Sequence, residues 1–356
     1  MECDVVSRIR SVLKAPYIIT GYLYFYIHFV VEVLCFYVLA RLIGDSPFLW
    51  IAPLIYDALA FVPQSIIGYF SDKFPKVKIG FIGLFLLTLG FIMFGLNIVS
   101  PYISIVFVAL GNAFLHVDGA VVTLRTSKGK LSHSAIFVSG GSFGVITGKL
   151  FGTSMVSFWI LVILALSTIP FIILANMYRD ECKDENLEFD YASSKVSGGW
   201  IILLAIFVVI VRGYMGYGLP TSWNKTVIQT ITLYCAMGCG KALGGILADI
   251  YGVKKVGILS SLLALPFLLF GDKLMFISLI GVLLFSMTMS ITLALIASVL
   301  KKAPGLAFGM TTIGLFLGSV PVFFFKFNTL LSNCTVIVIF TLICVLIFKK
   351  IIKDGV

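Results

Sequence analysis

The sequence predicts an all-α membrane protein whose twelve transmembrane helices form two pseudo-symmetric six-helix halves. Three observations predict this fold class: the composition, the number of membrane-length apolar segments, and a repeat of charged residues along the chain. Of the 356 residues, 60% are hydrophobic and only 12% are charged. A soluble domain of this length needs more polar surface to cover its core, so lipid must solvate most of this chain.

The apolar segments set the number of helices, because a helix needs about 20 apolar residues to cross a bilayer. Division at glycines, prolines and charge clusters gives twelve segments, which are 17–43, 47–70, 79–97, 102–124, 133–156, 158–177, 199–220, 226–247, 253–270, 274–299, 305–329 and 334–352. The acidic stretch between the sixth and seventh segments predicts a linker. We therefore expect an N-terminal bundle over 1–177, a cytoplasmic linker over 178–198 and a C-terminal bundle over 199–356.

The basic residues predict the orientation in the membrane. Nineteen of the 26 lysines and arginines fall on the side of the N-terminus if all twelve segments cross the bilayer. Positively charged loops stay in the cytoplasm, so a multi-pass protein of the cell membrane with both termini cytoplasmic is expected. The net charge of +10 is explained by these loops, and nucleic acid is not expected as a partner.

A shift of 177 residues relates the two halves. It places Gly68 on Gly245 and Asp72 on Asp249. It also superposes basic residues, namely Lys78 on Lys255, Arg125 on Lys302 and Lys149 on Lys326. Two parallel six-helix halves related by an axis along the membrane normal are a recurrent plan among transporters.

The loops that contain the two aspartates carry a family resemblance. The stretch GILADIYGVKK at 245–255 resembles the loop signature G-x-L-A-D-R-x-G-R-R of the major facilitator superfamily. The stretch GYFSDKFPKVK at 68–78 is similar, with Phe70 and Pro75 in place of the usual Leu and Gly. The resemblance covers the whole chain and implies the major facilitator fold and secondary transport.

The two loops are expected to form a cytoplasmic gate. A carboxylate at a helix end pairs with a base or with the N-terminus of a neighbouring helix. Asp72 is predicted to meet Arg125, and Asp249 to meet Lys302, with Gly68 and Gly245 at the matching loop starts. The alternative is that the loops only anchor the topology.

Ionisable side chains inside the predicted spans point to a substrate and proton site, because each costs at least about 3 kcal/mol at bilayer depth. His28 and Glu32 are one helical turn apart, and Asn112 and His116 repeat this spacing. A carboxylate beside a histidine suits proton exchange near neutral pH, so protons are the predicted coupling ion. A permanent structural hydrogen bond is the alternative.

Fixed cations lie in the same part of the sequence. Arg212 keeps its charge, and it suits an anionic ligand or a structural ion pair with Glu32. Lys149 and Lys326 are expected to snorkel to the headgroups or to form an external anion vestibule. Asp57, Asp118 and Lys241 are further ionisable residues of the spans, to which the sequence assigns no role.

A narrower resemblance concerns the first, fourth and seventh segments. His28-Phe-Val-Val-Glu32 resembles the H-F-x-x-D of the fosmidomycin-resistance branch, with Glu32 in place of Asp. Phe114-Leu-His116 is similar to its F-H-P, although Val117 replaces the proline, and residues 211–220 resemble its helix-seven arginine segment. The branch consists of proton-driven exporters, including exporters of a small anionic phosphonate drug.

Gly140, Gly144, Gly148 and Gly152 form a strict four-residue stripe in the fifth segment. Such a stripe lets another helix approach closely, and we expect a helix of the opposite half. Sliding during transport and static packing both explain it.

The expected function is secondary active transport by alternating access, in the form of proton-coupled export of a small organic, anionic or amphiphilic compound by a monomer in the lipid bilayer. An uptake symporter and a non-transporting sensor are the alternatives. No nucleotide-binding loop, serine–histidine–acid arrangement or paired cysteine motif favours an enzyme, a cofactor or a metal site.

Overall fold

The computed structural model describes residues 17–43, 51–182, 186–324 and 330–356. Within these ranges the chain is helical, and its only β-type pairing is an isolated bridge between Ala192 and Ile352. Eleven of the described helical segments are long and apolar enough to cross a membrane. The shorter apolar helix Ile79–Gly95 lies between two of them. The predicted all-α membrane fold is confirmed.

Each predicted segment of the first half corresponds to one helix or to an interrupted pair. The helices are α2 (Ile19–Ile43), α3 (Ile51–Phe61), α4 (Gln64–Lys73), α5 (Ile79–Gly95), α6 (Pro101–Thr126), α7 (Ser132–Thr153), α8 (Phe158–Leu166) and α9 (Ile169–Glu181). The α3–α4 interruption falls at Pro63, which has no N–H to continue the helical ladder. Residues 47–50, where the second segment was expected to begin, lie outside the described residues.

The second half follows the same order. Its helices are α10 (Gly198–Gly218), α11 (Val227–Tyr251), α12 (Val253–Phe270), α13 (Met275–Ser286), α14 (Met289–Val299), α15 (Pro304–Phe324) and α16 (Leu330–Ile351). A capping box of Thr226 and Gln229 begins α11, and Gly252 ends it with a φ of 98° that favours glycine. Lys326 lies outside the described residues.

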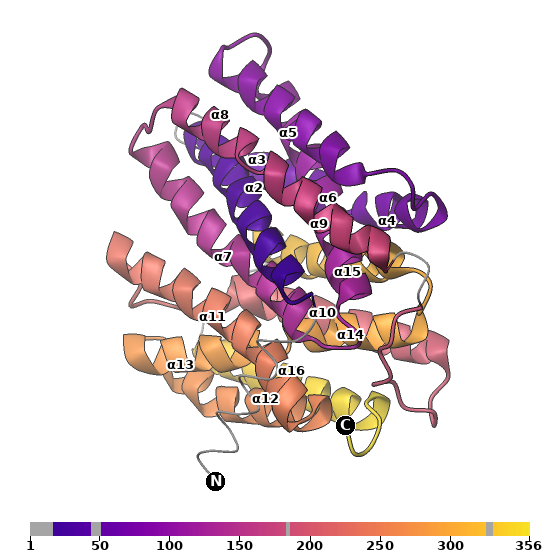
Figure 1. Cartoon of the computed structure of the whole chain (residues 1–356). Helices are drawn as coiled ribbons and strands as arrows, with labels where there is room; N and C mark the ends of the chain where they lie inside the picture. Colours follow the sequence, from indigo (N-terminus) through magenta and orange to yellow (C-terminus); the bar gives the residue numbers. More distant parts are fainter. Residues whose placement is uncertain (1–16, 44–50, 183–185, 325–329) are drawn as a thin grey trace, which may run out of the picture.

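The two halves meet along two helix pairs. Helix α4 packs against α15, and α7 packs against α11, so each pair joins one helix from each half. In Figure 1 the indigo-to-magenta helices form one group and the orange-to-yellow helices the other, with α4 directly above α15. These two pairs therefore fix how the halves sit against each other.

The segment between the halves is bonded to both. The Tyr191 hydroxyl donates to the carbonyl of Gly129 in the first half, at 2.6 Å. On the second half, the Leu187 N–H donates to the carbonyl of Lys301, and the Lys353 N–H donates to the carbonyl of Tyr191, both at 2.9 Å. The segment thus connects the halves in space as well as in sequence.

The glycine stripe of α7 packs against α2, which belongs to the same half. A Cβ at Gly152 would lie 2.7 Å from the Cβ of Ala40, and one at Gly144 would lie 2.7 Å from the Cβ of Glu32. The expectation of a partner from the opposite half is therefore wrong. The stripe instead holds α2 close to α7 along its length, which fixes the face of α2 that carries His28 and Glu32.

Replacing Gly144 by alanine should destabilise the protein, because the new Cβ would meet both the Phe29 carbonyl and the Glu32 side chain. We expect Gly144→Ala to cost about 1–3 kcal/mol, as overpacking does, and to lower the thermal unfolding midpoint in detergent. Gly216→Ala on α10 is the control, because its Cβ would meet nothing within 4 Å. Equal midpoints for both variants would contradict the close α2–α7 contact.

Candidate functional site

The Asp72 carboxylate binds the N-terminus of a helix in the other half. Its two oxygens accept hydrogen bonds from the backbone N–H groups of Gly305 and Leu306, at 3.0 and 2.9 Å. These groups belong to the first turn of α15, where N–H groups lack partners within the helix and the helix dipole favours an anion. The backbones approach closely here, since a Cβ at Gly305 would lie 2.8 Å from the Cα of Gly68.

Asp249 makes the equivalent contact in the opposite direction. Its carboxylate accepts from the backbone N–H groups of Leu131 and Ser132 at the start of α7, at 2.8 and 3.0 Å. Gly245 lets α11 approach α7 closely, because a Cβ at this position would meet Ala135 and the Leu131 carbonyl. Each half therefore places one carboxylate on a helix N-terminus of the other half.

The predicted partners of the two aspartates differ from those in the structure. The charge of Arg125 acts on Asp72, but the Asp72 carboxylate accepts its hydrogen bonds from backbone N–H groups. The predicted contact between Asp249 and Lys302 is not formed, and Lys302 is exposed. The physical reason is that α7 and α15 begin beside the two carboxylates and already supply donors.

A cavity of about 490 Å³ lies between the halves. This volume suits a small organic molecule. Glu32 and Asp57 of the first half line it, together with three basic side chains, which are Lys149, Arg212 and Lys241. The cavity also reaches Leu219 beyond the end of α10, and neither Asp72 nor Asp249 lines it.

The loop that follows α10, at this end of the cavity, is held by one carboxylate. Asp272 accepts from the N–H and the hydroxyl of Ser222, at 3.0 and 2.6 Å. These hydrogen bonds hold the pKa of Asp272 below its ordinary value. The neighbouring Thr221, which lines the cavity, is positioned by this contact.

Four predicted site residues come together in a buried cluster of the first half. The Glu32 carboxylate lies 3.6 Å from the Nε2 atom of His28 and 3.5 Å from the Nε2 atom of His116. The Nδ2 group of Asn112 donates to Glu32, at 3.2 Å. The helical spacing of these residues in the sequence predicted their faces, and the packing of α2 against α6 brings the faces together.

The cluster also contains residues that the sequence did not single out. The Tyr56 hydroxyl donates to Glu32 at 3.4 Å and accepts from the Asn112 amide at 2.6 Å. Cys35 lies 3.5 Å from the same amide. Tyr56 precedes Asp57, the ionisable residue found in this segment, but a tyrosine in an apolar run carries no signal of its own.

Two of the three basic side chains of the cavity, Arg212 and Lys149, are bound by neutral groups. The Arg212 guanidinium donates to the carbonyl of Phe285 and stacks 4.3 Å from the centroid of its ring. Lys149 donates to the Tyr234 hydroxyl at 2.7 Å, which links α7 to α11. The predicted snorkelling of Lys149 to the headgroups is therefore wrong. The predicted pair of Arg212 with Glu32 is not formed within the described ranges either.

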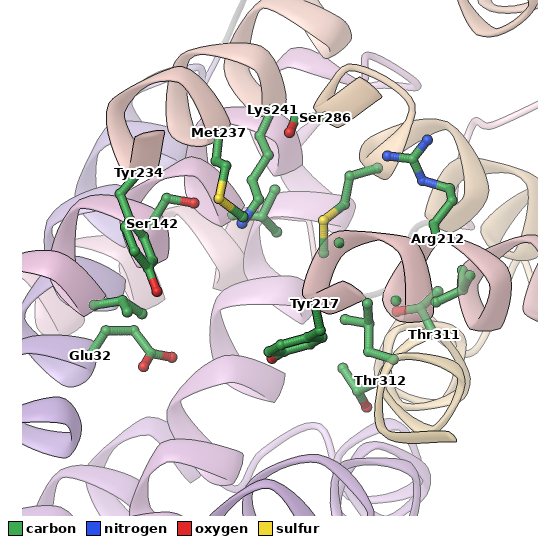
Figure 2. A pocket seen from close by; sticks show the side chains of 18 of the residues that line it. Glu32, Ser142, Arg212, Tyr217, Tyr234, Met237, Lys241, Ser286, Thr311 and Thr312 are labelled. Carbon is green, nitrogen blue, oxygen red and sulfur yellow. The ribbon is translucent and has the colours of Figure 1, made fainter. Parts of the chain in front are cut away.

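Figure 2 shows how the charged side chains face the cavity. Glu32 enters from α2, Lys241 from α11 and Tyr217 from α10, while Arg212 lies at the far edge. In the described part of the chain, Lys149, Arg212 and Lys241 form no ion pair with a carboxylate. Three cations thus face two carboxylates, one of which is engaged by the histidine cluster.

Asp118 lies outside the cavity. It forms a fully buried ion pair with Arg179 on α9, at 3.4 Å, and accepts from the Tyr24 hydroxyl. Arg179 also donates to the carbonyl of Pro75, at 2.7 Å. The group ties α2, α6 and α9 to the loop that follows α4, so we assign it a structural role.

The chain is similar in structure to transporters of known fold. A variant of the fucose:proton symporter FucP of E. coli matches with a TM-score of 0.64 and 14% identity, over 94% of this chain and 99% of that one. The human organic anion transporter MFSD10 matches with a TM-score of 0.65 and 13% identity, over the same shares. A structure of FucP in the outward conformation matches with a TM-score of 0.58 and 12% identity, over 91% of this chain and 98% of that one.

No protein-family model matches the sequence, and no curated protein does. The structural likeness at these identities establishes the fold. The chain is a multi-pass membrane protein with the fold of major facilitator superfamily transporters, as the loop signature predicted.

We predict that Asp72 and Asp249 hold their side of the molecule closed. Removing both charges should then open that side, because a carboxylate at a helix N-terminus contributes about 0.3–2 kcal/mol. We expect the double variant Asp72→Asn/Asp249→Asn to add a longer component to the distance between spin labels at the exposed Lys76 and Lys255. Asp180→Asn is the control, because Asp180 pairs with Lys78 on the surface of one half. An unchanged distance distribution in the double variant would contradict the closing role.

Proposed function

We propose that this protein is a secondary active transporter that works by alternating access and carries a small organic anion across the cell membrane. The observation that carries the proposal is the cavity between the halves, where Lys149, Arg212 and Lys241 face Glu32 and Asp57. The fold is that of transporters, and the cavity charge selects among ligands of suitable size.

An anionic ligand would offset an unfavourable arrangement of charges. A cation that is removed from water without a counter-charge is costly, and it marks a functional site when it lies inside a membrane protein. Arg212 of α10 and Lys241 of α11 both line the cavity from the second half, and a carboxylate or phosphonate group suits either as a partner. MFSD10 is named an organic anion transporter, which agrees with this choice.

The arrangement of the halves supports alternating access. The four N–H bonds to Asp72 and Asp249 close one side, which the basic loops predict to be cytoplasmic. The cavity reaches the other end of α10, so we assign this conformation as outward-facing. Return to the inward-facing state requires those bonds to break and the outer end, where Lys149 already reaches Tyr234, to close further.

Proton coupling and export are the finer parts of the proposal. They rest on the resemblance of the first, fourth and seventh segments to the fosmidomycin-resistance branch. Uptake by symport is the alternative, and FucP, which shares the fold, is named a fucose:proton symporter. The direction of transport relative to the proton flux separates the two.

Transport in proteoliposomes with an imposed pH gradient tests the proposal. We expect small carboxylates or phosphonates to accumulate in the compartment that protons leave, as antiport requires, and cationic dyes not to respond. Lys241→Met should lower anion transport about tenfold or more, because a hydrogen bond to a charged group is lost. Lys195→Met, in the exposed linker, is the matched control.

Two outcomes would count against parts of this account. Accumulation of a cationic dye without any response to anions would overturn the anionic substrate class. Accumulation of the anion in the direction of the proton flux would replace export by uptake and leave the substrate class standing.

A further inference from the structure

The hydrogen-bond partners of His28 and His116 show which ring nitrogen of each carries the proton. The Nδ1 atom of His28 lies 3.0 Å from the carbonyl oxygen of Phe137, and the Nδ1 atom of His116 lies 3.0 Å from that of Asn112. A carbonyl oxygen only accepts hydrogen bonds, so each Nδ1 atom carries the ring proton. Both Nε2 atoms therefore present lone pairs.

The two Nε2 atoms face each other at 2.7 Å. Two lone pairs at this separation repel, so the arrangement needs a cation between them. A shared proton and a metal ion both meet this need. Histidines that bind metals characteristically donate their other ring N–H to a backbone carbonyl or a carboxylate, as both histidines do here.

A third donor distinguishes the two cations. A proton shared by two nitrogens needs only those two atoms, whereas Glu32 Oε1 lies 3.6 and 3.5 Å from the Nε2 atoms of His28 and His116. Three atoms with these separations lie about 1.9 Å from a common point, close to the 2.0–2.2 Å of bonds from zinc to imidazole nitrogen and carboxylate oxygen. The three donor atoms come from buried side chains.

We propose that His28, Glu32 and His116 form a binding site for a divalent first-row transition-metal ion, such as Zn²⁺ or Co²⁺. Two imidazoles and a carboxylate suit metals of this class. Asn112 and Tyr56 donate to the Glu32 carboxylate and hold it in place. Three protein ligands leave a coordination position open, and all three residues line the cavity.

Charged neighbours tune the site in opposite directions. Lys241, across the cavity on α11, acts electrostatically on all three ligands and disfavours a cation. Asp57 on α3 interacts with Glu32 and favours one. A change that removes the Lys241 charge should therefore tighten metal binding, although the same change weakens anion transport.

The sequence predicted no metal site, because its cysteines form no metal-binding motif and the two histidines are 88 residues apart. Their meeting depends on the packing of α2 against α6. Metal binding is measured on the protein alone, so its outcome is independent of the transport assay.

Titration of the detergent-purified full chain with Co²⁺ and then Zn²⁺ tests the site. The protein should carry an affinity tag without histidine. We expect one Co²⁺ per chain, with visible absorption bands that Zn²⁺ removes and a raised unfolding midpoint. His116→Ala and Glu32→Gln should each weaken Co²⁺ binding about 100-fold or more. This is a larger loss than the about 10–100-fold that follows mutation of residues that only hydrogen-bond to a metal ligand.

Two further variants sharpen the test. His133→Gln, which removes the third histidine of the chain, is the control and should bind as the native protein does. Lys241→Met should bind several-fold more tightly. Glu32→Gln keeps the size of the side chain, so it remains informative if His116→Ala fails to fold.

Absence of saturable binding in the native protein would overturn the site and leave a shared proton between the two imidazoles. Binding that Glu32→Gln and His116→Ala leave unchanged while His133→Gln abolishes it would also overturn the assignment. A single Co²⁺ that is lost in both ligand variants and retained in the control would support it.

Discussion

The contact between a carboxylate of one half and the first turn of a helix in the other half is the interaction on which this structure depends. It occurs twice, from Asp72 to α15 and from Asp249 to α7. Each contact contributes about 0.3–2 kcal/mol, which is enough to bias two packings of the halves and small enough to be reversed by a ligand. Neither the two aspartates nor their N–H partners line the cavity between the halves, which extends past the end of α10.

The cavity joins two halves that differ in chemistry although they share a plan. The first half supplies the cluster of His28, Glu32 and His116, and the second supplies Arg212 and Lys241. The 177-residue repeat does not duplicate these residues. A ligand between the halves would therefore meet hydrogen-bond donors for an anion on the second half and metal-ligating atoms for a cation on the first half. Such a ligand can favour the state that brings both sets closest, which is how binding energy shifts a two-state equilibrium.

Much of the fold was predictable, because hydrophobic length and repeated charges are local features of the sequence. The helical spacing of His28 with Glu32 and of Asn112 with His116 likewise predicted two faces that now meet. The partners were less predictable. A backbone N–H group at a helix start has no residue type, so the donors to Asp249 could not be read from the sequence. A glycine stripe predicts a close neighbour but not its identity, and α2 was missed for that reason. Tyr56 joins the cluster through tertiary packing alone.

Accessibility of one cavity position from each side of the membrane tests the central claim most directly. A cysteine at Gly216, in a background without native cysteines, lines the cavity and has open space around it. With Asp72 and Asp249 intact, a membrane-impermeant maleimide should label it mainly from the side of the membrane that Leu219 faces, and replacement of both by asparagine should increase labelling from the side of the two aspartates. Labelling that is the same from each side, and unaffected by the two replacements, would contradict alternating access controlled by these carboxylates.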